Sequence, residues 1–217
     1  MITFDIETLP TTDERVIAQL AASIKPPGTI KKQESKDAWM QENYDAALKE
    51  KIADTALNGA YGRIACIAWR DDNGTVFNTL KHLSESEIIK VFYDQILGAK
   101  EFCGHNIAGF DLPFLKHRSM ILGIKPSSGI LHAMNAKPWD DCIKDTMLMW
   151  SSDKNKMIKL ETILWLFDIK HDSPDFDGSM VAETWQIDPQ KVIDYCVADV
   201  KAEFELYNRM IFNHPVF

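Results

Sequence analysis

The sequence lacks several features that would place the chain in a specialised class. Its four cysteines are far apart and form no C-x-x-C pair, which argues against a disulfide framework and against a zinc site. Ten glycines, nine prolines and no repeat or low-complexity tract exclude a fibrous or disordered chain. With no signal peptide and no long apolar run, we expect a reduced, cytoplasmic protein with no membrane partner.

Basic residues are also scarce relative to acidic ones. There are 24 Lys and Arg against 32 Asp and Glu, which gives a net charge of −8. Broad, non-specific binding to duplex DNA usually needs a basic face, so this balance argues mildly against it. It does not exclude a protein that holds a few nucleotides at a metal centre, because divalent ions would neutralise the carboxylates there.

The chain does contain enough apolar material for one substantial core. Its 217 residues are 46% hydrophobic, and we expect a single domain that covers residues 1–217. At the start of the chain, Ile2, Phe4 and Ile6 alternate with polar residues. This period of two predicts a strand with one face in the core.

The order of the remaining patterns predicts a mixed α/β sheet rather than a helical bundle or a β-sandwich. A helical insertion, at about residues 11–60, separates the first strand from the second. The elements expected after it are strands at 63–69 and 75–82 joined by a turn at Asn73-Gly74, a helix from Ser84 to about 97, a strand at 101–104, and helices at about 111–122, 157–167 and 188–211.

A loop within the insertion concentrates positive charge. It carries Lys25, Lys31, Lys32 and Lys36 against a single acid, Glu34. Two interpretations stay open at this stage. The lysines form either a solvated surface loop or a flexible basic flap over a polyanionic substrate.

Four acidic residues from three distant segments suggest a common metal site. Asp5 and Glu7 share the non-core face of the first strand, Asp111 closes the run GHNIAGFD, and Asp199 follows Tyr195 by four residues on the last helix. Buried like charges do not ionise together unless a cation joins them. Carboxylate oxygens favour Mg²⁺ or Mn²⁺, and therefore phosphoryl chemistry.

Taken together, the motifs resemble those of the DEDDy 3′–5′ exonucleases. D-I-E, then N-x-x-x-F-D, then Y-x-x-x-D follow one another in the order of that group. The runs DIET, G-R-I-x-x-I, GHNIAGFDLPFL and DYCVADV are most similar to stand-alone relatives of the proofreading domain of family-B DNA polymerases. The resemblance implies an RNase H-like mixed β-sheet flanked by helices, with the helical insertion between the first two strands.

The resemblance also implies roles for the motif residues. Asp5, Glu7, Asp111 and Asp199 would hold two divalent metal ions, Mg²⁺ or Mn²⁺, with Asp5 bridging both. Tyr195 would orient the attacking water through its hydroxyl. The expected reaction removes nucleoside 5′-monophosphates from the 3′ end of single-stranded DNA.

Four further residues match positions that contact the terminal nucleotide in such enzymes. They are Thr8, Leu9, Asn106 and Phe110, although Phe110 taken alone could equally be core packing. Two alternatives to a DNA exonuclease remain, namely a 3′–5′ exoribonuclease and a catalytically silent nucleic-acid-binding module. The second is disfavoured because the chain keeps all four acids and the tyrosine. A polymerase or repair protein as a partner is left open.

Overall fold

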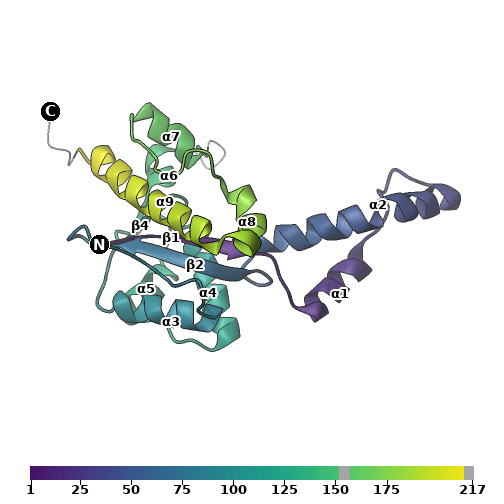
Figure 1. Ribbon diagram of the computed structural model, residues 1–217, viewed down its shortest axis with the longest axis horizontal. Coiled ribbons are helices and arrows are strands. Elements are labelled where there is room, and N and C mark those ends of the chain that lie inside the picture. Colours follow the sequence, from purple (N-terminus) through teal and green to yellow (C-terminus); the bar gives the residue numbers. More distant parts are fainter. Residues whose placement is uncertain (152–156, 213–217) are drawn as a thin grey trace.

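The computed structural model describes residues 1–151 and 157–212 and shows a five-stranded mixed sheet with helices on both faces (Figure 1). The α/β fold predicted from the sequence is therefore confirmed. The strand order is β3-β2-β1-β4-β5, with β1 at the centre, antiparallel to β2 and parallel to β4. The strands are β1 (Ile2–Leu9), β2 (Arg63–Arg70), β3 (Val76–Asn78), β4 (Phe102–Gly104) and β5 (Ile143–Asp145).

The alternation along β1 separates an apolar face from an acidic one. Ile2, Phe4 and Ile6 belong to a core shared with α3 (Glu85–Gln95), α4 (Asp111–Leu122) and α5 (Ser128–Ala133). The opposite face of β1 lies under α9 (Pro189–Met210), which crosses β1 and β2 (Figure 1). Carboxylates on that face are thereby covered by a helix rather than left in open water.

Helix ends follow the local signals in the sequence. Ser84 and Glu87 form the reciprocal hydrogen bonds of a capping box at the start of α3. Gly123 ends α4 in the left-handed conformation, with φ of 65°. Asp188 caps α9, and Pro189 occupies its first turn. In the described ranges, no helix combines the length and the apolar character that crossing a bilayer requires.

Several short elements were not predicted. These are β5, α5, α6 (Thr146–Trp150) and α8 (Val181–Ile187), and α7 (Leu160–Leu166) is shorter than expected. Elements of three to seven residues show little periodicity, which explains why the sequence did not reveal them. The expected strand at 75–82 ends early, because Thr79 makes the last hydrogen bonds to Ile67 and a turn follows.

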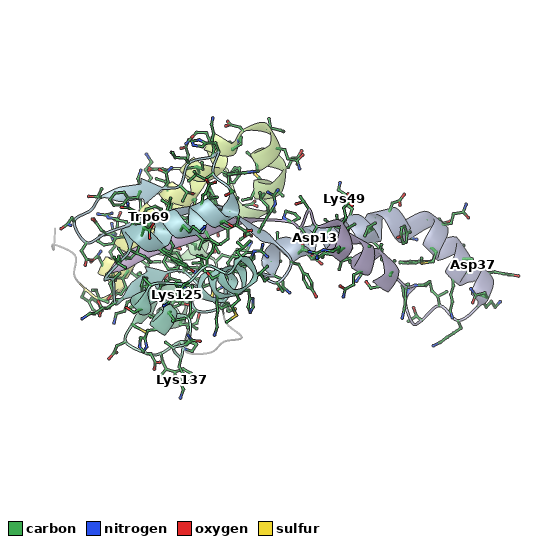
Figure 2. All side chains as sticks on the ribbon, turned by 90° about the horizontal axis from the view of Figure 1, so that it is seen from below. Asp13, Asp37, Lys49, Trp69, Lys125 and Lys137 are labelled. Atoms are coloured by element: carbon green, nitrogen blue, oxygen red, sulfur yellow. The ribbon has the colours of Figure 1, made fainter. Side chains whose placement is uncertain are left out.

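The helical insertion projects from the body as a two-helix arm (Figures 1 and 2). We use "the arm" for α1 (Glu14–Ser23), the connecting residues 24–32 and α2 (Gln33–Asp54). Neither helix contains a buried side chain. A 3₁₀ turn, η1 (Thr55–Leu57), joins the arm to the body, where the Thr8 hydroxyl donates to the Ala56 carbonyl over 2.7 Å.

Candidate active site

Three of the four predicted acids come together between β1 and α9. One carboxylate oxygen each from Asp5, Glu7 and Asp199 lies within 4.8 Å of the others. Asp5 and Glu7 share a face because two residues separate them on a strand, and α9 brings Asp199 over that face. Cys196 joins the two elements, since its thiol lies 3.3 Å from Oδ2 of Asp5 and 3.4 Å from the Asp5 carbonyl.

Asp111 lies beside this group rather than within it. The residue begins α4 and is 3% exposed, and its Oδ1 accepts a hydrogen bond from the backbone N–H of Ile6 over 3.2 Å. Its carboxylate is still close enough to raise the pKa of Asp5. The fourth acid is therefore a neighbour of Asp5 on the side of β4 and α4.

The acids are withdrawn from water and lie close to one another. Burial raises the pKa of Asp5, Glu7, Asp111 and Asp199, and for Asp5 the next causes are the charges of Asp111 and Asp199. Across the described residues, no Lys or Arg forms an ion pair with any of them. Such a set of carboxylate oxygens fits a hard divalent cation, which would favour the ionised form of each group.

Tyr195 lies one turn before Asp199 and is fixed in place by aromatic neighbours. Its side chain is buried, with ring centroids 4.8 Å from Phe176 and 5.8 Å from His171. Burial, and then the charges of Asp199, Glu7 and Asp5, raise the pKa of the phenol well above its usual range. Tyr195 therefore keeps its proton and can act only as a hydrogen-bonding group at neutral pH.

His171 is a residue of this site that the sequence did not indicate. Its Nε2 lies 2.9 Å from Oδ1 of Asp199, and its Nδ1 accepts a hydrogen bond from the backbone N–H of Ser173. Because Nδ1 is an acceptor, the ring proton lies on Nε2 and is donated to Asp199. The hydrogen bond to Asp199 raises the pKa of His171. The residue lies outside any regular element, so no pattern could have revealed it.

Glu203 is a fifth acid beneath the group. It is 2% exposed, its Oε1 accepts from the backbone N–H of His105 over 2.9 Å, and its Oε2 has no hydrogen-bond partner among the described residues. Burial and the charge of Asp199 raise its pKa. Glu203 lies four residues after Asp199, so the helical spacing that linked Tyr195 to Asp199 could have indicated it.

The loop that precedes Asp111 is held by another buried acid, Asp145. Its two carboxylate oxygens accept from the backbone N–H groups of Asn106 (3.1 Å) and Ala108 (3.0 Å). Asn106 adopts φ of 64°, and Asp145 thus stabilises an unusual backbone at this junction. The ring nitrogens of His105 contact Thr146 Oγ1 and the Ile158 carbonyl, so this histidine is engaged within the fold.

One cavity adjoins the acidic group, and a second cavity adjoins the first. Glu7, Thr8 and Phe110 line a cavity of about 490 Å³ whose other wall is the root of the arm, from Ala53 to Leu57. Asn106 lines a larger one, of about 900 Å³. Gly178 and Ser179 line both, so these two cavities are neighbours.

The four predicted substrate contacts thus have different positions. Thr8 and Phe110 share the smaller cavity and Asn106 lies in the larger one. The side chain of Leu9 is 3% exposed and packs in the cluster under α9. Residues of α8, α9 and β2 cover this side chain. The contact between Leu9 and a substrate stays a prediction, and it would involve the backbone next to Thr8.

Comparison with known proteins identifies the family. Residues 60–215 match the model for predicted 3′–5′ exonucleases related to the exonuclease domain of PolB. The chain belongs to this family. The matched part contains Asp111, Tyr195 and Asp199, whereas Asp5 and Glu7 precede it. Membership indicates an exonuclease, and hence a nucleic-acid substrate.

A solved structure supports the fold. The chain is similar to the family B DNA polymerase from the hyperthermophilic archaeon Pyrobaculum calidifontis, with a TM-score of 0.59 and 16% identity over 97% of this chain and 24% of that one. It therefore spans about a quarter of the polymerase, and at this identity the likeness concerns the fold alone. No curated protein matches the sequence.

Proposed function

We propose that the chain acts as one exonuclease domain that removes nucleoside 5′-monophosphates from the 3′ end of single-stranded DNA. The observation that carries this proposal is the gathering of Asp5, Glu7 and Asp199 within 4.8 Å, with Tyr195 one helical turn away. Family membership supports the class of reaction, and the geometry of these residues supports its chemistry.

The four acids are proposed to hold two divalent ions, Mg²⁺ or Mn²⁺. Asp5 would be the ligand shared by both ions, because its carboxylate lies within 4.8 Å of those of Glu7 and Asp199 and close enough to Asp111 for that charge to raise its pKa. Such ions would supply an activated water at neutral pH and offset the charge on the departing 3′ oxygen. With that chemistry available, the site needs no strong protein base.

Tyr195 and His171 are proposed to position the reacting groups. The raised pKa of Tyr195 keeps its hydroxyl protonated, so it can orient the attacking water but cannot remove a proton from it. His171 donates to Asp199 and fixes the direction of that carboxylate. In this assignment the tyrosine is catalytic and the histidine is a positioning residue.

The cavity lined by Glu7, Thr8 and Phe110 is proposed to receive the terminal nucleotide. The half-buried ring of Phe110 forms part of its wall, and aromatic rings bind bases of any sequence by stacking. Asn106 would contact the next part of the strand from the adjoining cavity, and Leu9 would contribute its backbone alone.

Matched 5′-labelled DNA and RNA oligonucleotides test the function and the choice of sugar together. We expect a ladder that shortens from the 3′ end of DNA in the presence of Mg²⁺ or Mn²⁺, with 5′-mononucleotides as products. Faster shortening of RNA would make the enzyme an exoribonuclease, and metal-independent binding without turnover would make it a silent binding module.

Tyr195→Phe removes only the hydroxyl and tests its role. We expect kcat to fall about a hundredfold, the lower range for a positioned group that assists proton movement. Tyr207→Phe, on the same helix α9, makes the same chemical change away from the acids and serves as the matched control. Equal rates for the two variants would refute the role given to Tyr195.

A further inference from the structure

The arm is built as an extension that packs mainly on itself. Along α2, Met40, Tyr44 and Leu48 recur every four residues and are half-buried, and Ile24 in the connecting segment is 6% exposed. This spacing makes a narrow apolar seam along α2, and α1 and α2 contact each other. Figure 2 shows Asp37 at the far end of the arm and Lys49 nearer the body. The far end therefore stands clear of the sheet and of its covering helices.

Positive charge gathers at that far end. We use "the tip" for residues 24–36, which contain four lysines and a single acid, Glu34. Lys25, Lys31 and Lys32 are exposed, and within the described ranges no ion pair involves any lysine of the tip. The chain as a whole carries a net charge of −8, so the charge of the tip is opposite in sign to that of the protein. Unpaired exposed lysines are the groups with which proteins hold phosphates without regard to sequence.

The rest of α2 has the opposite charge. Its acids outnumber its lysines in residues 37–54, where they are Asp37, Glu42, Asp45, Glu50 and Asp54 against Lys49 and Lys51. We use "the shaft" for residues 37–54. Phosphates would be repelled by the acids of the shaft and attracted by the lysines of the tip. The charge pattern thus favours one contact region at a distance from the body, rather than binding along the whole arm.

The root of the arm lies at the candidate active site. Ala53, Asp54, Ala56 and Leu57 form a wall of the 490 Å³ cavity proposed for the terminal nucleotide. From there α2 extends over 22 residues, which at about 1.5 Å per residue places the tip about 33 Å away. Stacked bases rise about 3.4 Å each, so this length corresponds to about ten stacked nucleotides.

We propose that the arm is a second nucleic-acid-binding element, whose basic tip holds the phosphate backbone of the substrate about ten stacked nucleotides behind the 3′ end. The inference rests on the proposed function, because the substrate must enter the cavity at the root for the tip to meet its backbone. The acidic shaft would keep the intervening strand away from the helix. The arm would then increase affinity for long substrates without taking part in hydrolysis.

A series of hairpin substrates measures this reach. Each has a stem of 4, 8, 12 or 16 base pairs that ends in the same four-nucleotide single-stranded 3′ overhang. KM and kcat are measured for each with Mg²⁺. For the wild-type protein we expect KM to fall once the single-stranded end and the stem together exceed about ten nucleotides, which is from the 8-base-pair stem upward, with kcat unchanged. In the triple variant Lys25→Gln/Lys31→Gln/Lys32→Gln, this fall should disappear, which raises KM on the longest stem about ten- to hundredfold near 0.1 M salt.

A matched triple variant controls for net charge. Lys90→Gln/Lys125→Gln/Lys137→Gln removes the same charge from exposed lysines of the body, and Figure 2 shows Lys125 and Lys137 far from the arm. The control variant should have the KM of the wild-type protein on every stem. The KM of the wild-type protein should also depend more steeply on salt concentration than that of the tip variant. Equal KM shifts in both triples, or a shift that does not depend on stem length, would overturn it.

The shortest stem separates this inference from the proposed function. Its backbone cannot reach the tip, so cleavage of it reports the active site alone. If the short substrate is cleaved and the tip variant matches wild type on all stems, the arm proposal fails while the exonuclease stands. If no substrate is cleaved, the proposed function fails, and the arm proposal fails with it. Tight binding of the tip to acidic proteins without any effect on KM would also count against it.

Discussion

The active-site face and the arm differ in where their charged side chains lie. At and beside the space between β1 and α9, four acids are each less than 10% exposed and have no Lys or Arg partner among the described residues, namely Glu7, Asp111, Asp199 and Glu203. In the arm, the charged residues of both helices are exposed or half-buried. The first arrangement raises the free energy of the metal-free fold, whereas the second leaves it almost unchanged.

This difference indicates what each region is for. A protein keeps uncompensated buried carboxylates where a bound ion offsets their repulsion and gives them chemistry to perform. Exposed lysines at the end of a projecting arm lose little by staying solvated, and they can bind a polyanion when one arrives. The buried charges of the body are thus suited to chemistry, and the exposed charges of the arm are suited to binding the substrate. Substitutions in the two regions should therefore have different effects.

Asp5→Asn should have the largest effect of the changes considered. It removes the central ligand, and we expect kcat to fall about a thousandfold, equivalent to about 4 kcal/mol of lost stabilisation. The metal-free variant should melt at the same temperature as wild type or higher, because one uncompensated carboxylate is gone. Activity within a factor of ten of wild type, measured on the same labelled oligonucleotide, would show that Asp5 does not hold the reacting ion.

Divalent ions should stabilise the body, and more so at higher pH. Because the pKa values of these acids are raised, the folded, metal-free chain keeps protons that the unfolded chain has released. Its stability therefore falls as the pH rises from the ordinary carboxylate pKa through the raised values. Metal competes with those protons, and its contribution therefore grows with pH. At a hundred times Kd the gain is about 2.7 kcal/mol, or a rise in Tm of roughly 5–10 °C.

Calorimetry at pH 6 and pH 8, with and without Mn²⁺, measures this gain. The rise in Tm should be greater at pH 8 than at pH 6, and it should shrink in Asp5→Asn. A metal-induced rise that is equal at both pH values, or equal in the variant, would mean that the ions bind elsewhere.

His171→Ala should have a smaller effect, because the histidine acts through Asp199. Removing a hydrogen-bond donor to a metal ligand typically lowers activity or metal affinity by about tenfold or more. We expect about a tenfold loss of kcat and a higher Mn²⁺ concentration for half-maximal rate. His171→Gln, which keeps an N–H donor, should recover most of it. If both variants lose activity equally while their Mn²⁺ dependence stays that of wild type, the residue only supports the local fold.

The structural elements and site residues that could be predicted from the sequence are those with a repeating pattern or a complete motif. The alternation of β1, the capping box of α3 and the start of α9 all lie where expected. The acids could be expected to meet, because a strand places Asp5 and Glu7 on one face and the motif order resembled a known family. The family match at 60–215 now confirms that resemblance.

The remaining features depend on tertiary contacts that no local pattern encodes. His171 and Asp145 come from an irregular segment and a three-residue strand, and their partners lie 28 to 39 residues away. The side chain of Leu9 packs under α9 and not in the cavity. The alternation of faces along a strand does not show which element covers a given side chain. Glu203 is the exception, since its helical spacing from Asp199 was readable.

Leu48→Ala should have the smallest effect, and it tests whether the arm is separate from the body. Leu48 is half-buried in the seam of the arm, so we expect a loss below about 1 kcal/mol and a fall in Tm of no more than roughly 4 °C. Leu115→Ala, the same substitution at a fully buried position of the body, should cost about 2–5 kcal/mol. Cleavage of a short oligonucleotide should be unchanged in Leu48→Ala. A loss as large as that of Leu115→Ala would mean that arm and body unfold as one unit, and the separation of capture from chemistry would then lose its structural basis.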